Sequence, residues 1–250
     1  MTVKEIFDFL NLKYPVSSAC DFDNPGILTG DPNAAVTNAV IALDCTPAVL
    51  KAAAEKGCEL IITHHPVIFS PLKRVCSDSV VFRLIKNCIS VISMHTNLDI
   101  GQNGVNDSLC GALLLRDVKK HTAEDGYLLN SALLPSPLSA PALAEYIGKR
   151  LGGHVRYSSG FTGKISRVLV CSGSGGNYLG ELGRSGCDAL ITADVKHNAF
   201  IDAEFLGKAV FDAGHFETED VVIEPLKRIL EQNFKDVQFF TEHTPSIKFI

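Results

Sequence analysis

The chain has 250 residues, of which 46% are hydrophobic, enough to form one large core or two coupled smaller ones. Its net charge is −5, so it lacks the basic excess with which proteins usually bind nucleic-acid phosphates. The apolar stretches, such as 58–62 and 88–94, are far shorter than a bilayer span, and the N-terminus lacks the features of a secretory signal. We therefore expect a cytoplasmic protein without a membrane segment, for which nucleic acid is a disfavoured partner.

The cysteine pattern argues against disulfides and against a cysteine metal site. The eight cysteines are scattered, mostly within apolar runs, and no two of them form a Cys-x-x-Cys pair. Thiolate ligands normally come in closely spaced pairs, so a metal or redox site built on cysteine is disfavoured. We expect reduced thiols that lie mainly in the core.

The first half of the chain alternates predicted helices and strands. Apolar residues at positions 3, 6, 7 and 10 share one helix face and predict a helix over 3–10 that ends before Pro15. The next helix has clear boundaries, with Thr46 as N-cap, Pro47 in the first turn and Gly57 as terminator. The remaining predicted elements are strands at 36–43, 60–63 and 89–94 and a helix at 79–87.

The second half continues the same alternation. Helices are predicted at 140–151, 178–184, 198–206 and 221–232, and strands at 154–158, 165–171, 189–192 and 208–212. Such alternation implies parallel strands joined by helical crossovers, and hence an α/β fold with a mixed sheet in each half. Residues 117–137, which are polar and then rich in Leu, Pro and Ser, are predicted to join a first half at 1–125 to a second at 126–250.

The two halves contain an internal repeat. A shift of 129 residues aligns Gly57–His65 with Gly186–Asp194 without a gap. At a slightly different shift, His95–Asp99 is similar to His215–Glu219, so each copy ends in His-x-x-x-acid. In open α/β sheets the functional residues lie just beyond the carboxyl ends of strands. A duplicated fold that gathers histidine and carboxylate at these ends predicts a metal site shared between the halves.

His64 and His65 follow the strand predicted at 60–63. Neighbouring side chains of a strand point to opposite faces, so the pair shares one ion only if the chain turns there, whereas a two-metal centre accommodates both. The alternative is a pair of loop histidines hydrogen-bonded to the backbone. The two further His-x-x-x-acid segments favour the metal site.

The acids Asp99 and Glu219 each lie four residues after a histidine. Both acids could face the same cleft as their histidines if the chain turns helically after each strand. For Asp99 the alternative is a turn residue or a helix N-cap. For Glu219 the alternative ligand is Glu217, which lacks an acidic counterpart in the first copy, where Asn97 stands.

The predicted ligands indicate a class of chemistry. Imidazole and carboxylate without thiolate suit Zn, Fe, Mn, Co or Ni, and carboxylates can bridge two ions. Two such ions activate water at neutral pH and polarise a substrate oxygen, so hydrolysis is the natural reaction class. The second copy has Ala193 and Asp194 where the first has two histidines, so the repeats are expected to contribute unequal parts to one site.

Two further segments are candidates for binding an anionic substrate. Lys196 and His197 could bind an anion, or His197 could act as an acid or base, the alternative being a helix start capped by Asp194. The turn containing Gly173 and Gly175 can aim backbone N–H groups at a phosphate, although a tight turn alone explains it equally well. The sequence lacks the Gly-x-Ser-x-Gly and His-Glu-x-x-His motifs, which excludes serine hydrolases and zincin proteases.

Five segments, in this order, resemble one known family: 62–69, 93–99, 171–175, 192–197 and 214–219. They are similar to those of the GTP cyclohydrolase 1 type 2 homologues, also called the Ngg-one-interacting factor three-like family, and the likeness runs nearly from end to end. The stretch 21–30 also resembles that family's Asp-Asn-x-Gly-Leu segment. The resemblance implies two intertwined α-β repeats with mixed sheets, a ring-like homohexamer, and a centre with two divalent metal ions.

The resemblance also implies roles for single residues. The metal ligands of that family correspond here to His64, His65, Asp99, His215 and Glu219. His95 is then a nearby substrate contact or acid/base, and is the candidate catalytic residue. The sequence departs from the pattern of that family in two places. Asn198 stands where a second histidine often follows His197, and the inserted domain of longer relatives is absent.

The implied function is hydrolysis of a nucleotide or related heterocycle by a metal-dependent enzyme, with GTP ring opening suggested by the family name. The alternative is a non-catalytic metal-sensing or ligand-sensing ring that acts through protein partners. Metal-dependent turnover would distinguish the two.

Overall fold

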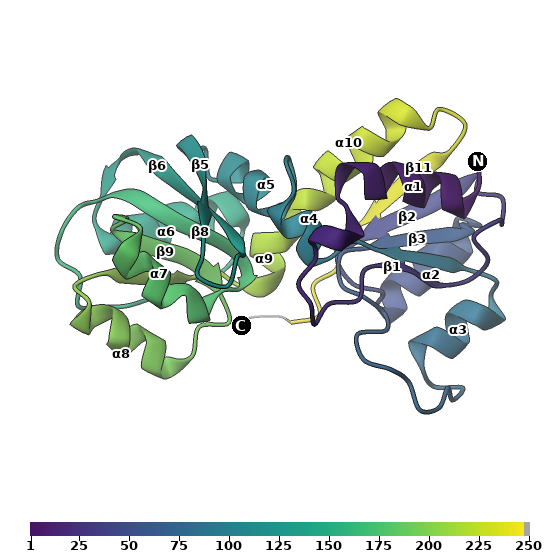
Figure 1. Cartoon of the computed structure of the whole chain (residues 1–250), viewed down its shortest axis with the longest axis horizontal. Coiled ribbons are helices and arrows are strands. Elements are labelled where there is room, and N and C mark those ends of the chain that lie inside the picture. Colours follow the sequence, from purple (N-terminus) through teal and green to yellow (C-terminus); the bar gives the residue numbers. More distant parts are fainter. Residues whose placement is uncertain (248–250) are drawn as a thin grey trace. The chain divides into compact units, whose positions relative to one another are not determined.

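The computed structural model describes residues 1–247, and the chain forms two compact units (Figure 1). Unit 1 contains residues 1–102 and the C-terminal segment that begins at Ile223, and unit 2 contains residues 103–222. The chain therefore builds unit 2 as an insertion within unit 1. These units do not coincide with the halves predicted at 1–125 and 126–250. Within residues 1–247 no helix is both long and apolar enough to cross a membrane.

Unit 1 contains a five-stranded mixed sheet in the order β1-β4-β3-β2-β11. Its strands are β1 (Gly26–Thr29), β2 (Asn38–Ala42), β3 (Leu60–Thr63), β4 (Ser90–Ser93) and β11 (Gln238–Glu242), of which only the edge strand β1 is antiparallel to its neighbour. Its helices are α1 (Val3–Lys13), α2 (Pro47–Glu55), α3 (Val80–Lys86), α4 (Thr96–Ile100) and α10 (Ile223–Asn233), with a short 3-10 turn at Val16–Ser18.

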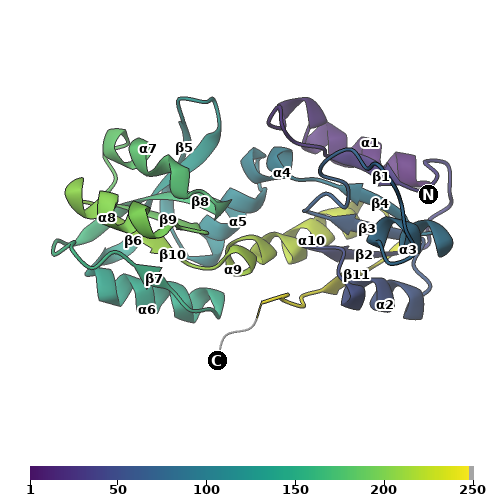
Figure 2. The same cartoon turned by 90° about the horizontal axis from the view of Figure 1, so that it is seen from below.

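Helices cover both faces of this sheet (Figures 1 and 2). Val40, Ile61 and Val91 pack on one face against α2 and α3. Helices α1 and α10 cover the opposite face, onto which the alternate residues of the same strands project. Because both faces are covered, the central strands are buried along nearly their whole length and their central residues are apolar, which is why the sequence predicts them well.

Unit 2 contains a six-stranded mixed sheet in the order β5-β6-β8-β9-β10-β7. Its strands are β5 (Arg116–Thr122), β6 (Leu128–Leu138), β7 (Arg156–Tyr157), β8 (Ile165–Ser174), β9 (Ala189–Ala193) and β10 (Ala209–Asp212), and β8, β9 and β10 are parallel. Its helices are α5 (Val105–Ala112), α6 (Ala140–Leu151), α7 (Leu179–Arg184), α8 (His197–Phe205) and α9 (His215–Glu219), with 3-10 turns at Gly176–Tyr178 and Asp220–Val222. Helices α5 and α6 pack on one face, and α7 and α8 on the other.

Residues 117–137 form most of the β5–β6 hairpin at the edge of this sheet, so the junction predicted there is wrong. Strand β5 is polar and exposed along nearly its whole length, and it therefore lacks the alternation that indicates a strand. Pro135 and Pro137 lie in the stretch of β6 between Leu133 and Leu138, where pairing with β8 is irregular. A proline there interrupts no regular ladder bond.

The internal repeat is also present in the structure. The order β2-α2-β3-α3-β4-α4 of unit 1 matches β8-α7-β9-α8-β10-α9 of unit 2. In each unit an acid before the middle strand accepts hydrogen bonds from two consecutive backbone N–H groups of the preceding strand segment. These contacts are Glu59 with Thr37 and Asn38 (3.1 and 3.0 Å) and Asp188 with Ser166 and Arg167 (2.8 and 3.0 Å). The acids and both sets of donors are related by the predicted shift of 129 residues.

The last part of the repeat follows a different register from the one predicted. Parallel pairing sets Ser93 level with Thr63, and Asp212 level with Thr192. Since Thr63 and Thr192 are equivalent, β4 and β10 are related by a shift of 119 residues. The alignment of the two His-x-x-x-acid segments uses a shift of 120, so these segments are one residue out of structural register.

The eight cysteines, all within the described residues, are thiols, as the sequence predicts. Four of them are buried, whereas Cys76 and Cys88 are exposed. Burial raises the pKa of Cys45 to about 12 and that of Cys110 to about 11, which keeps these thiols protonated and unreactive at neutral pH.

The first testable prediction concerns Glu59. Burial raises the pKa of this carboxyl, but hydrogen bonds from Asn38 and Thr37 outweigh it and hold the pKa below 4.5. The ionised group thus stabilises the fold above that pH, and the stabilisation is lost as pH falls through the lowered pKa. We expect Glu59→Gln to reduce the free energy of unfolding by about 1 kcal/mol at neutral pH, and by less as the pH falls through the lowered pKa of Glu59.

Urea denaturation over this pH range measures the effect. Glu55→Gln is the control, because Glu55 forms an exposed ion pair with Lys51, and its loss should change the free energy of unfolding by less than about 0.5 kcal/mol. Equal effects of the two substitutions would contradict the role given to Glu59.

Candidate metal-binding site

Three histidines of unit 1 lie together beyond the carboxyl ends of its parallel strands. His64 and His65 follow β3, and His95 follows β4 two residues after its end. Register pairing sets the ends of β2, β3 and β4 level with one another, which brings the following residues to one edge of the sheet. The ring centroids are 5.0 to 5.6 Å apart, and one nitrogen from each ring lies within 4.8 Å of the others. This spacing suits a bound metal ion.

Each of the three rings is oriented by a hydrogen bond at Nδ1. The acceptors are the backbone oxygen of Met94 for His64 (2.8 Å), Asp44 for His65 (2.8 Å) and Asp23 for His95 (2.7 Å). A carbonyl or carboxylate can only accept a hydrogen bond, so each Nδ1 carries a proton and Nε2 remains as the ligand atom. Metal-binding histidines are typically held by this kind of contact.

Asp99 extends the cluster with a carboxylate. Its Oδ1 lies 3.4 Å from Nε2 of His64. Asp99 lies within α4 and is not its N-cap, so the helical turn expected after the strand is present. Asn97 supports that turn, because its Oδ1 accepts from the backbone N–H of His95 at 2.9 Å and its amide donates to the backbone of Tyr14.

Asp23 is held ionised beside His95. It accepts hydrogen bonds from Nδ1 of His95 and from both the backbone and the hydroxyl of Thr96. Burial raises the pKa of Asp23, but these hydrogen bonds outweigh burial and lower the pKa to about 2. The negative charge that orients His95 is therefore present throughout the physiological pH range.

In unit 2 a second imidazole–carboxylate pair lies on helix α9. Nε2 of His215 is 3.0 Å from Glu219, one turn later, and Nδ1 of His215 is 2.7 Å from Asp194. Asp194 follows β9 with a φ of 51°, in the left-handed region that Asp tolerates better than most residues. The N-cap of α8 is Lys196, so Asp194 orients His215 and does not cap that helix.

Glu219, and not Glu217, lies beside His215. Glu217 packs against Gly214, where an added Cβ would lie 2.1 Å from its carboxylate. Glu219 packs against Gly173, which has a φ of +59° and where an added Cβ would lie 2.0 Å from Oε1 of Glu219. Gly173 is therefore required for the position of the acid.

The glycine-rich turn has acceptors for its N–H groups within unit 2. Gly173 donates to the hydroxyl of Thr218 at 3.1 Å, and Gly175 donates to the hydroxyl of Thr192 at 2.9 Å. A phosphate would have to displace these contacts. The turn supports the segment that carries Glu219, and the geometry does not favour the phosphate role predicted for Gly173 and Gly175.

Lys196 and His197 lie exposed at the start of α8. Within residues 1–247 neither forms a hydrogen bond or an ion pair with His215 or Glu219. Their role in anion binding stays a prediction.

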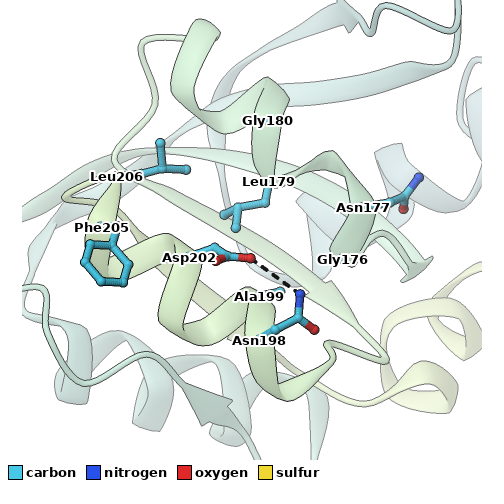
Figure 3. A pocket seen from close by; sticks show the side chains of 9 residues that line it. All are labelled: Gly176, Asn177, Leu179, Gly180, Asn198, Ala199, Asp202, Phe205 and Leu206. Atoms are coloured by element: carbon cyan, nitrogen blue, oxygen red, sulfur yellow. Dashed lines mark hydrogen bonds between the residues drawn. The ribbon is translucent and has the colours of Figure 1, made fainter.

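A groove of about 550 Å³ lies between α8 and the segment that contains α7 (Figure 3). It is lined by Gly176, Asn177, Leu179, Gly180, Asn198, Ala199, Asp202, Phe205 and Leu206. Figure 3 shows the ring of Phe205 at one end and the amide of Asn198 turned toward Asp202, 3.4 Å away. Neither His215 nor Glu219 is among these lining residues, so the groove is separate from that pair.

Two residues of the site, Asp44 and Asp23, are absent from the set predicted from the sequence. Asp44 comes two residues after β2, and the rule that selects polar residues after strands would have found it. Asp23 lies in a loop 72 residues before His95. It belongs to the stretch 21–30 that resembles the family's Asp-Asn-x-Gly-Leu segment, and this resemblance is the signal that could have selected it, although it does not indicate the contact with His95.

The chain matches one known protein family along nearly its whole length. The sequence model of the family described as Duf34/NIF3 (NGG1p interacting factor 3) matches residues 1–247. The chain belongs to the Duf34/NIF3 family. The resemblance inferred from its motifs is thereby confirmed.

Curated Duf34/NIF3 relatives carry the name GTP cyclohydrolase 1 type 2 homolog. The Clostridium perfringens relative is 31% identical over 250 aligned residues, which cover 96% of this chain and 95% of the relative. The Clostridium acetobutylicum relative is 33% identical over 230 residues, which cover 88% of this chain and 85% of the relative. The similarity extends through both units of the chain.

Solved structures confirm the α/β fold. A hypothetical protein of Staphylococcus aureus matches with a TM-score of 0.92 and 26% identity, covering 100% of this chain and 99% of that protein. Reduced HcgD from Methanocaldococcus jannaschii matches with a TM-score of 0.83 and 28% identity, covering 96% and 97%. Together with the histidine–carboxylate cluster, family membership supports a metal-binding Duf34/NIF3 protein.

The second prediction tests the acceptor of His65. We expect Asp44→Ala to weaken zinc binding about 10- to 100-fold, because the ring loses the carboxylate that holds its tautomer and orientation. Asp44→Asn should be milder, since the amide oxygen still accepts from Nδ1. Competition with a chelating dye measures the affinity.

Asp31→Ala is the matched control, because Asp31 is exposed and accepts a local hydrogen bond from the backbone N–H of Asn33. An unchanged zinc affinity in Asp44→Ala, or an equal loss in Asp31→Ala, would contradict the assignment.

Proposed function

We propose that this Duf34/NIF3 protein binds two divalent metal ions per chain and hydrolyses a nucleotide or a related heterocycle. The observation that carries the proposal is the cluster of three imidazoles in unit 1, each oriented through Nδ1 by a carbonyl or carboxylate. Such a cluster offers neutral nitrogen ligands to Zn, Fe, Mn, Co or Ni.

The ligand set that we propose is the one predicted from the sequence: His64, His65, Asp99, His215 and Glu219. Unit 2 by itself offers His215 and Glu219, two donors, whereas structural and catalytic metal sites generally use three or four protein ligands. We therefore propose that this pair completes the coordination of the ions bound by unit 1. The unequal contribution agrees with the divergence of the repeats at Ala193 and Asp194.

The remaining residues of the site are assigned to positioning and proton transfer. When bound, two divalent ions activate water and polarise an oxygen of the substrate. Asp23 holds the proton of His95 on Nδ1 and would stabilise a positive charge on the ring. His95 is thus suited to contact the substrate or to transfer a proton through Nε2.

By family resemblance, we also propose that the chain assembles as a homohexameric ring.

The third prediction concerns metal content. We expect His65→Ala and His215→Ala each to lower the bound metal from about two ions per chain to one or fewer, because each removes a proposed ligand. Elemental analysis of the purified variants measures this ratio. His121→Ala is the control, because His121 pairs with Glu181 at 3.1 Å and belongs to a different cluster. The ligand set is refuted if the metal content of the first two variants is unchanged.

The fourth prediction concerns turnover. We expect metal-loaded protein to hydrolyse at least one nucleotide of a substrate screen, and His95→Ala to slow turnover about 100-fold or more while keeping its metal. Liquid chromatography of the products measures the rate, with His121→Ala as the control. If no substrate turns over with any of the five metals, although metal stays bound, the enzymatic part of the proposal fails.

A further inference from the structure

Two exposed phenylalanine rings lie beside the histidine cluster of unit 1. The side chains of Phe22 and Phe69 are 66% and 50% exposed, and their ring centroids are 6.3 Å apart. Phe69 also meets the ring of His95 edge-on, at 6.1 Å and 85°. Isolated exposed aromatic side chains are common, but two that contact each other and a site histidine form an apolar surface at the site.

The backbone segments that carry these rings are held in place. Asp23 accepts hydrogen bonds from His95 and Thr96, and Asn24 donates to the backbone oxygen of Ile68 at 2.6 Å. These anchors are sequence neighbours of the two phenylalanines, so they restrain the backbone that carries the rings. A ligand that covers the rings would therefore lose little free energy in ordering that backbone.

The shape and polarity of this surface restrict its ligand. Phenyl rings offer no hydrogen bonds and no charge, so they add little to the binding of a phosphate. Planar heteroaromatic rings stack on aromatic side chains regardless of their substituents, because every such ring has a π-face. Next to a histidine with a ligand or acid/base function, such stacking would hold a ring at the reacting groups.

We propose that Phe22 and Phe69 stack against a planar heteroaromatic ring of the substrate and place that ring beside His95. The identity of the reaction rests on the proposed function, but the stacking itself is measurable without catalysis. In this arrangement the heteroaromatic ring of the substrate, and not its phosphate, binds to the two phenylalanines.

The chain contains no tryptophan, so Phe69→Trp introduces a single fluorescent reporter at the surface in question. In chelator-treated protein, we expect guanosine monophosphate to quench this tryptophan saturably, whereas ribose 5-phosphate, which lacks the ring, should not. Phe82→Trp is the matched control, because Phe82 is a partly exposed phenylalanine (37%) of helix α3 in the same unit. Its fluorescence should show no saturable response.

A second measurement does not depend on the tryptophan. In equilibrium dialysis, Phe69→Leu and Phe22→Leu should each weaken the binding of guanosine monophosphate about tenfold relative to the unsubstituted chain. Phe82→Leu should leave the affinity unchanged.

The proposal is overturned if ribose 5-phosphate binds as tightly as guanosine monophosphate. It is also overturned if Phe82→Trp responds like Phe69→Trp, or if the leucine variants bind normally. These failures, with metal content and turnover intact, would leave the proposed function standing. Saturable quenching by a protein that fails to take up any of the five metals when they are supplied in excess would instead overturn the proposed function alone.

Discussion

The parallel pairing of β2, β3 and β4 is the constraint on which the site of unit 1 depends. Their last residues are level in the sheet, so the chain leaves three neighbouring strands at one edge. The segments that follow supply Asp44, the pair His64 and His65, and His95, which are far apart in sequence but adjacent there. The buried apolar core packed on these strands holds this edge of the sheet, and it thereby positions the polar residues that follow the strands.

The Nδ1 hydrogen bonds turn this cluster of histidines into a site with a defined chemistry. Three unrestrained imidazoles could rotate and exchange tautomers, whereas these rings all keep a proton on Nδ1 and present Nε2. Unit 2 contains the same kind of contact, in which Asp194 accepts a hydrogen bond from Nδ1 of His215. In unit 1 a histidine, His65, stands at the position equivalent to Asp194, so the repeats share an architecture but have exchanged a ligand for a residue that orients one.

The sequence predicts the parts of the fold that are set locally. His64, His65 and the helix that begins after Thr46 could be recognised because a buried apolar strand and a capped helix have strong local patterns. Strand β5 could not, since it is an exposed edge whose partners lie elsewhere in the chain. The contact of Asp23 with His95 could not be predicted either, because the two residues are 72 positions apart and no local pattern indicates that they meet. The one-residue difference between the repeats at His215 became apparent only from the pairing of β4 and β10 with their neighbours.

The central claim is that His64 and His65 bind metal through Nε2 while Nδ1 of each ring stays hydrogen-bonded to the protein. Anomalous diffraction from crystals of the zinc-loaded protein tests it most directly. We predict anomalous peaks next to Nε2 of His64 and His65, with Nδ1 still bonded to the oxygen of Met94 and to Asp44. Peaks at Nδ1, or no peak at these histidines in crystals with zinc in excess, would contradict the claim.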